Sequence, residues 1–329
     1  MKISILGGGS WGTAMAYNLS HKHDVIMYIR NKENACEIND HHENKRYLPG
    51  YILPDNISAT SNIEEVLGNK IIINAIPTQN IRSMLEQFSD KFKEDSIIVN
   101  LSKGIEKSTS KRISEIFKEY LPNNTFAALS GPSHAEEVII DSPTSIVVAC
   151  EDEDVAKFLQ KELSTDNLRI YTNTDVVGVE FGGAVKNVLA LGIGMIDGLG
   201  FGDNPKAAMM TRGIHEMVRF CMEMGGDRNT LYGLAGLGDL IVTATSRHSR
   251  NRKAGELIGK GHTVDQLENE INMVVEGIPT TKALKNISEQ RHIYMPITNI
   301  IYKILYENLD LAEATAMLMQ RAKKDEFDF

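Results

Sequence analysis

The chain has 329 residues, of which 42% are hydrophobic, and this length and composition predict two folded domains. Its formal net charge of −9 disfavours binding to nucleic acid or to an anionic membrane surface, although a local basic pocket for a small anion is allowed. The three cysteines, Cys36, Cys150 and Cys221, are widely spaced and form no CxxC motif. We therefore expect no disulfide framework and no metal.

We expect a cytoplasmic protein. The first predicted strand begins at Lys2, which leaves no room for a signal peptide. The longest apolar stretch is interrupted by Gly, Lys and Asp, so no unbroken run reaches the ~20 residues of a membrane span. The cysteine pattern is that of a reducing compartment.

A glycine motif follows the first predicted strand. Residues 2–6 (KISIL) read as a short apolar strand, residues 7–12 (GGGSWG) follow, and a helical pattern comes next. This is G-x-G-x-x-G between a strand and a helix, the context of a dinucleotide site. Gly7 would permit the tight turn, Gly9 the approach of the pyrophosphate, and Gly12 the packing of helix on strand. The alternative is a tightly packed turn without a ligand.

The second predicted strand, residues 24–29, bears on the choice of cofactor. A site that prefers NAD usually has an acidic residue at the end of this strand, to bind the ribose 2′-hydroxyl. Here the strand is followed by Arg30, and Asp24 lies at its other end. Arg30 can pair with a 2′-phosphate, so NADP is favoured over NAD, unless Arg30 is only a surface residue.

Further strands alternate with helical segments and predict a largely parallel, doubly wound sheet of the Rossmann type. Ligands bind beyond the carboxyl ends of such strands. Lys103 and residues 130–133 follow strand ends, which makes Lys103 a candidate ligand contact rather than only a loop charge. The other predicted strands cover residues 70–76, 96–100, 125–129, 145–149 and 168–171.

Strand patterns stop after about residue 172, and the rest of the chain reads as helix. We therefore predict an α/β dinucleotide-binding domain over residues 1–175 and an all-α substrate and catalytic domain over 176–329. Helical patterns after the first apolar run cover residues 205–226, 251–259, 264–270, 280–289, 296–307 and 311–321.

Lys186 stands out in the apolar run of residues 176–204. Its neighbours at helical spacing are Gly182, Gly183, Leu189 and Ala190, none of them charged. Desolvation there would disfavour the ammonium form, lower the pKa of the lysine and suit it to proton transfer near neutral pH. The alternative is a lysine that extends from a core helix to water.

Asp239 ends a glycine-rich turn, residues 233–239. It could pair with Lys186, although taken alone it reads more simply as a helix cap. His134 and His248 also lie in candidate site loops, and we rank either as a catalytic base below Lys186. Glu276, within residues 273–277 (MVVEG), is uninformative by itself.

Arginines gather at residues 245–252 (TSRHSRNR) of this acidic chain. Ser249 could cap a helix that starts near Arg250, and its free N–H groups would then lie beside the guanidinium groups. Arginine forks and helix N-terminal amides suit a phosphate monoester. The alternative is a basic surface turn.

With these motifs in place, the chain resembles the bacterial NAD(P)-dependent glycerol-3-phosphate dehydrogenases along nearly its whole length. The matching motifs occur in order, and several are highly specific. They are residues 7–12 (GGGSWG), 102–104 (SKG), 130–136 (SGPSHAE), 182–187 (GGAVKN), 197–204 (DGLGFGDN), 211–213 (TRG), 233–239 (GLAGLGD), 248–252 (HSRNR) and 274–277 (VVEG).

The resemblance implies reversible reduction of dihydroxyacetone phosphate to sn-glycerol 3-phosphate for glycerophospholipid synthesis. Lys186 would be the proton acceptor in oxidation, with Lys103 and Asp239 beside it. The implied substrate contacts are Lys103, Gly131, Ser133, Lys186, Asp239, Ser249, Arg250 and Asn251. The implied cofactor contacts, together with Gly7, Gly9 and Gly12 of the glycine motif, are Ser10, Trp11, Arg30, Tyr47, Lys103, Ala135, Arg250, Val274 and Glu276.

Two other readings stay open at this point. One is another two-domain Rossmann dehydrogenase, such as a ketopantoate reductase or a 6-phosphogluconate-type enzyme, which explains residues 249–251 less simply. The other is a nucleotide-sensing protein without catalysis. The apolar helical second half makes a homodimer plausible.

Overall fold

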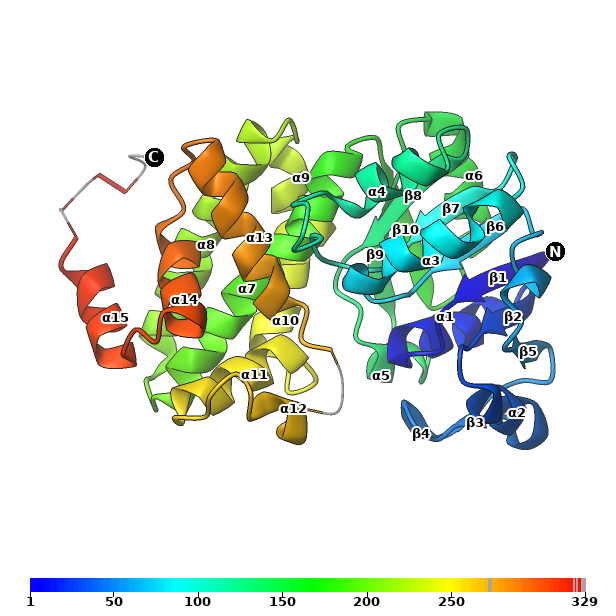
Figure 1. The fold of residues 1–329 in the computed structure, drawn as a ribbon, viewed down its shortest axis with the longest axis horizontal. Helices are drawn as coiled ribbons and strands as arrows, with labels where there is room; N and C mark the ends of the chain where they lie inside the picture. The colour runs from blue at the N-terminus through cyan, green and yellow to red at the C-terminus, as the bar shows by residue number, and fades with distance from the viewer. Residues whose placement is uncertain (272–273, 322, 324, 327–329) are drawn as a thin grey trace.

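The computed structural model describes residues 1–271, 274–321, 323 and 325–326, and it has two halves that lie side by side (Figure 1). One half is a sheet flanked by helices, and the other is built from helices. This is the predicted fold class, a Rossmann-type α/β half followed by an all-α half.

The sheet of the first half has eight strands in the order β10-β9-β8-β7-β6-β1-β2-β5. Every neighbouring pair is parallel except β8 and β9, so the prediction of a largely parallel sheet is confirmed. The strands are β1 (Lys2–Leu6), β2 (Asp24–Tyr28), β5 (Ile57–Thr60), β6 (Ile71–Asn74), β7 (Ile97–Asn100), β8 (Thr125–Ser130), β9 (Thr144–Ala149) and β10 (Leu168–Asn173).

Helices cover both faces of this sheet because successive residues of a strand point to opposite faces. Ile3 and Ile5 of β1 join a core with Met15, whereas Leu6 joins a second core with Ile72. The helices of this half are α1 (Ser10–Ser20), α2 (Lys32–His41), α3 (Ile81–Phe88), α4 (Ile113–Tyr120), α5 (Ala135–Val138) and α6 (Glu153–Leu163).

The strand β5 and a small hairpin were not predicted. The hairpin pairs β3 (Glu43–Asn44) with β4 (Leu48–Ile52), and β5 adds to the sheet beside β2. These segments are short and half polar, so their sequence carries little strand signal. The hairpin brings Tyr47 to the glycine motif, as described below.

Helix α7 (Val176–Gly198) is the centre of the second half, and 94% of its most apolar 18-residue window is buried (Figure 1). By length and mean hydropathy, α7 could span a membrane. The expectation that its Gly and Lys residues rule out a membrane span by composition is therefore corrected. The other helices are α8 (Asp203–Glu223), α9 (Arg228–Tyr232), α10 (Asp239–Thr245), α11 (Arg250–Gly259), α12 (Leu267–Glu270), α13 (Gly277–Gln290), α14 (Pro296–Tyr306) and α15 (Leu311–Met319).

Helices α7 and α11 touch through their backbones. A Cβ atom on Gly194 would lie 2.0 Å from the carbonyl oxygen of Arg252, and one on Gly255 would lie 2.0 Å from that of Leu191. Any side chain at either position would push the two helices apart. This contact holds the beginning of α11 against the helix that carries Lys186.

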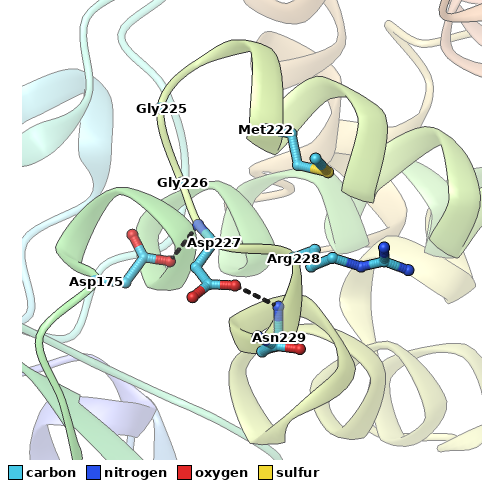
Figure 2. A pocket seen from close by; sticks show the side chains of 7 residues that line it. All are labelled: Asp175, Met222, Gly225, Gly226, Asp227, Arg228 and Asn229. Atoms are coloured by element: carbon cyan, nitrogen blue, oxygen red, sulfur yellow. Dashed lines mark hydrogen bonds between the residues drawn. The ribbon is translucent and has the colours of Figure 1, made fainter.

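Asp175 joins the two halves where β10 ends and α7 begins. Its carboxylate accepts a hydrogen bond from the backbone N–H of Gly178 at 2.7 Å. It accepts another from the backbone N–H of Asp227 at 2.8 Å (Figure 2). Asp227 in turn accepts from the N–H of Asn229 and caps α9. These bonds tie the start of α7 to the turn after α8. The surface pocket drawn in Figure 2 is lined by residues of this turn and contains no predicted site residue.

Candidate active site

The glycine motif has the geometry that a pyrophosphate needs. Gly7 has φ +111°, and a Cβ atom there would lie 2.9 Å from the carbonyl oxygen of Ala75. Gly12 lies so close to Gly7 that a Cβ atom would approach its carbonyl oxygen to 2.2 Å, whereas no atom lies within 4 Å of a Cβ atom on Gly9. Helix α1 begins at Ser10 without a side-chain cap, so its first N–H groups are available to an anion. The motif therefore fits a dinucleotide.

The predicted cofactor residues around this motif come from three segments. Ser10 donates a hydrogen bond to the carbonyl oxygen of Tyr47 at 3.1 Å, which holds the hairpin loop against the start of α1. Arg46 lies over the ring of Tyr47, 5.4 Å from its centroid. Trp11 packs against the core of the sheet, and Arg30 is exposed just beyond β2.

Several predicted site residues of the first half lie at the carboxyl edge of the sheet. The parallel neighbours β8, β7, β6 and β1 are followed by Gly131, Lys103, Thr78 and Gly7 respectively. Because the carboxyl ends of parallel strands meet at one edge, these residues line a single crevice edge. Lys103 and Gly131 therefore follow the ends of two adjacent strands, β7 and β8, as predicted.

Three predicted residues form the polar centre of the site. The ammonium of Lys186 donates a hydrogen bond to Oδ1 of Asp239 at 3.0 Å, and that of Lys103 donates to Oδ2 at 2.5 Å. Asp239 and Lys186 are buried, with 2% and 6% of their surfaces exposed. One carboxylate thus holds a lysine from each half of the protein. Asp239 is therefore a pairing residue, and its interpretation as only a helix cap is wrong.

Burial lowers the pKa of Lys186 to about 8, against the opposing effect of the Asp239 carboxylate. The charges of Lys103 and Arg250 add to this lowering. Burial alone would raise the pKa of Asp239, but the two lysine ammonium groups outweigh burial and hold it below its usual value. The arrangement keeps a carboxylate charged beside an amine that can exchange a proton near neutral pH.

Thr243 is a site residue that sequence reasoning missed. Its hydroxyl accepts a hydrogen bond from Lys186 at 2.7 Å, and it is 3% exposed. Thr243 lies four residues after Asp239 on α10, so both face the same side of that helix. This spacing is a signal that could have identified it.

Asn187 and Asn251 connect the lysine helix to the predicted phosphate site. The amide of Asn251 donates to Oδ1 of Asn187 at 3.0 Å, and Oδ1 of Asn251 accepts from the N–H of Gly277 at 2.9 Å. Ser249 caps α11 by accepting from the N–H of Arg252 at 3.2 Å. Arg250 is exposed at the first turn of α11 and has no ion pair within the described part of the chain.

The loop after β8 supplies the other predicted substrate residues. Gly131 has φ +138°, and its carbonyl oxygen accepts hydrogen bonds from Lys103 at 3.1 Å and from the Ser133 hydroxyl at 3.0 Å. Ala135 is buried at the start of α5. The loop therefore shares the Lys103 ammonium with Asp239.

The histidine alternatives lie beside this centre rather than in it. Nε2 of His134 is 3.5 Å from the carbonyl oxygen of Val242, and the rings of His134 and His248 are 6.0 Å apart. Burial, with the nearby Lys186 charge, lowers the pKa of His134. Within the described residues, neither ring hydrogen-bonds to Lys186 or Asp239.

The segment before α13 returns to the nucleotide half. Oε1 of Glu276 accepts a hydrogen bond from the backbone N–H of Thr78 at 3.0 Å, beyond the end of β6. Burial raises the pKa of Glu276. Val274 is 46% exposed in the same segment, and Met273, within the predicted motif, lies outside the described residues. Glu276 is thereby placed at the crevice edge, as a cofactor contact requires.

Comparisons with known proteins match both halves. The family profile described as "NAD-dependent glycerol-3-phosphate dehydrogenase N-terminus" covers residues 2–156, and the one described as "NAD-dependent glycerol-3-phosphate dehydrogenase C-terminus" covers residues 175–316. A glycerol-3-phosphate dehydrogenase [NAD(P)+] of Clostridium botulinum is 48% identical over 99% of each chain. One of Clostridium tetani is 46% identical over 98% of this chain and 93% of its own. The crystal structure of glycerol-3-phosphate dehydrogenase from Coxiella burnetii superposes with a TM-score of 0.93, at 35% identity over 97% of this chain and 99% of that one.

Proposed function

Because the chain belongs to the NAD-dependent glycerol-3-phosphate dehydrogenase family, we propose that it reversibly reduces dihydroxyacetone phosphate to sn-glycerol 3-phosphate, with NADPH favoured over NADH. It is an NAD(P)-dependent oxidoreductase that acts on a CH–OH group. The observation that carries the proposal is the buried Lys186, bonded to the same carboxylate as Lys103 and tied through its neighbour Asn187 to the start of α11.

Lys186 is the proton-transfer group of the proposed reaction. In reduction its ammonium gives a proton to the substrate carbonyl oxygen, and in oxidation the neutral amine takes the hydroxyl proton. Asp239 and Thr243 orient the amine and stabilise its charged form. Lys103 adds a second positive charge where negative charge develops on the oxygen, which stabilises the transition state.

The cofactor would be held by the glycine motif, residues 7–12, with Arg30 and Tyr47 on one side and Glu276 on the other. A bound nicotinamide supplies the hydride in reduction and accepts it in oxidation. Arg30 is the group proposed to pair with a 2′-phosphate, because no acidic residue occupies its place after β2.

The phosphate of the substrate would be held by Arg250, Asn251 and the N-terminal amides of α11. Gly131 and Ser133 would complete the substrate contacts from the opposite loop. A phosphate held away from the reacting carbon positions that carbon, and such positioning contributes several kcal/mol to catalysis.

The two rival readings are disfavoured. A ketopantoate reductase or 6-phosphogluconate-type enzyme does not account for family profiles that match both halves. A nucleotide sensor without catalysis has no need of a buried lysine whose pKa is lowered to about 8.

The deciding experiment is reduction of dihydroxyacetone phosphate by NADPH and by NADH, followed in parallel by absorbance, with ketopantoate as the competing substrate. The proposal expects turnover of the phosphate with both cofactors, faster with NADPH, and none of ketopantoate. Ligand-induced thermal shifts without turnover would instead support the sensor.

Residues 1–175 would bind the cofactor and residues 176–329 the substrate. The enzyme would act in the cytoplasm and supply glycerophospholipid synthesis. The apolar helical half would support a homodimer.

A further inference from the structure

Glu180 is a buried carboxylate on α7 that the proposed reaction does not use. It is 9% exposed and lies six residues before Lys186 on the same helix. Its bonding partners come from the other half of the protein. Oε1 accepts from the backbone N–H of Ser114 at 2.8 Å, and Oε2 accepts from the Ser114 hydroxyl at 2.5 Å and from Arg112 at 2.8 Å.

These bonds add a cap from another element to the start of α4. Arg112 occupies the N-cap position of α4, where Glu115 of the first turn accepts a hydrogen bond from its backbone N–H at 2.8 Å. The Arg112 guanidinium also donates to the Ser114 hydroxyl at 2.8 Å. The N–H of Ser114 is one of the first N–H groups of a helix, which have no partner within the helix. Glu180 satisfies it from α7, and its negative charge lies at the positive end of the α4 dipole.

Arg112 completes the contact between the halves. Its guanidinium pairs with Glu180 and lies 5.7 Å from the ring centroid of Phe181, the next residue on α7. The Arg112 side chain is 17% exposed and that of Glu180 is 5% exposed, so water screens this pair weakly. Glu180 therefore joins the halves through charge-assisted hydrogen bonds, outside the predicted substrate and cofactor residues.

We call the contact of Glu180 with Arg112 and Ser114 the joint between the halves. Its position matters because the proposed reaction uses both halves. Lys186 stands on the helical half, whereas the glycine motif that would hold the cofactor stands on the other. Six helical residues separate Glu180 from Lys186 by about 9 Å along α7. Any shift of α7 against α4 is passed to the lysine along a rigid, buried helix.

We propose that Glu180 is a positioning residue: by capping α4 across the domain junction, it sets where Lys186 lies relative to the cofactor half. This inference rests on the proposed function. Misplacing a reacting group by about 1 Å can cost on the order of 100-fold in rate, so a loosened joint should lower kcat. Cofactor and substrate binding should change less than kcat, because most proposed cofactor contacts lie in the nucleotide half and the proposed phosphate contacts, Arg250 and Asn251, both lie in the helical half.

The protein offers a matched control in Glu216. This carboxylate is 2% exposed, and it caps α14 by accepting hydrogen bonds from the N–H groups of Ile297 and Thr298 and from the Thr298 hydroxyl, each within 2.8 Å. Its chemistry matches that of Glu180, but all its partners lie in the helical half. Glu216→Gln therefore removes a buried capping carboxylate without touching the junction.

The test compares Glu180→Gln with Glu216→Gln in the full-length protein. For Glu180→Gln we expect kcat to fall about tenfold or more, with the KM for dihydroxyacetone phosphate within about twofold of wild type. The NADPH Kd should also stay within about twofold, measured by the fluorescence of Trp11, the single tryptophan. Glu216→Gln should lower Tm and leave kcat within about twofold. Equal kcat losses in the two variants, or an unchanged kcat in Glu180→Gln, would overturn the proposal.

A second measurement does not depend on turnover. Hydrogen exchange at the first turn of α4 should speed up in Glu180→Gln and stay unchanged in Glu216→Gln. Unchanged exchange in Glu180→Gln would refute the joint, whatever the wild-type activity. Absence of wild-type turnover with accelerated exchange would refute the proposed function alone.

If Glu180→Gln does not fold, Ser114→Ala is the milder variant. It removes the hydroxyl's hydrogen bond to Oε2 and the one that this hydroxyl accepts from Arg112, and it keeps the backbone bond to Oε1. A fall in kcat with unchanged NADPH binding, restored by Ser114→Thr, would support positioning. A normal kcat in Ser114→Ala would then count against it.

Discussion

The side chain of Asn251 donates a hydrogen bond to that of Asn187, at 3.0 Å. Each is the sequence neighbour of a residue with a proposed role, because Asn187 follows Lys186 and Asn251 follows Arg250. The bond therefore fixes the position of Lys186 on α7 relative to the beginning of α11, where we propose that the phosphate is held. The two ends of a small substrate would meet groups whose separation is fixed by this amide pair.

Replacement of Lys186 by methionine tests the proton-transfer role. Lys186→Met keeps the apolar stem and removes the amine, and loss of a general acid–base group costs about 100- to 10,000-fold in turnover. NADPH binding, followed by Trp11 fluorescence, should persist. Lys157→Met is the control, since Lys157 is exposed on α6 and forms a surface ion pair with Glu153 at 3.0 Å. Substantial activity in Lys186→Met would remove the lysine from this role.

The two reaction directions should depend on pH in opposite ways. Burial lowers the pKa of Lys186 to about 8. Reduction uses the ammonium, so kcat/KM for dihydroxyacetone phosphate should fall as the pH rises above this value. Oxidation uses the neutral amine, so kcat/KM for glycerol 3-phosphate should rise to a plateau above it. Initial rates from about pH 6 to about pH 10 in both directions measure this, and profiles of the same sign would contradict the assignment.

Arg250 should contribute to recognition of the substrate phosphate and not to reduction of the carbonyl. Arg250→Leu removes a charge-assisted contact of about 1.5–3 kcal/mol, so kcat/KM for dihydroxyacetone phosphate should drop about 10- to 150-fold. The ratio of that value to kcat/KM for unphosphorylated dihydroxyacetone should collapse. Arg247→Leu provides the control, because Arg247 is exposed in the same segment but precedes the helix. A loss of equal size for both substrates would show that Arg250 does not recognise the phosphate.

Arg30 should determine the preference for NADPH. Arg30→Ser removes the proposed partner of the 2′-phosphate, and we expect the ratio of kcat/KM with NADPH to that with NADH to fall about tenfold or more. Lys32→Ser changes a neighbouring exposed charge and should leave the ratio near its wild-type value. If the two variants behave alike, net charge rather than a specific contact governs the preference.

Local sequence was enough for the architecture of each half. Alternating buried strands and helices predicted the parallel sheet, because the period of apolar residues reports which face is buried. The glycine motif predicted the turn at Gly7, because its backbone geometry depends on residues only a few positions apart. The uncharged neighbours of Lys186 likewise predicted a buried amine, since they lie on its own helix.

The pairings across the chain were decided by tertiary structure. Lys186 and Lys103 lie 53 and 136 positions from Asp239, and no local pattern specifies that one carboxylate serves both. Read alone, Asp239 looked like a helix cap, and the part played by Glu180 at the domain junction had no local signature at all. Which buried charges meet depends on how the two halves pack against each other, and that packing depends on many contacts between segments that lie far apart in the sequence.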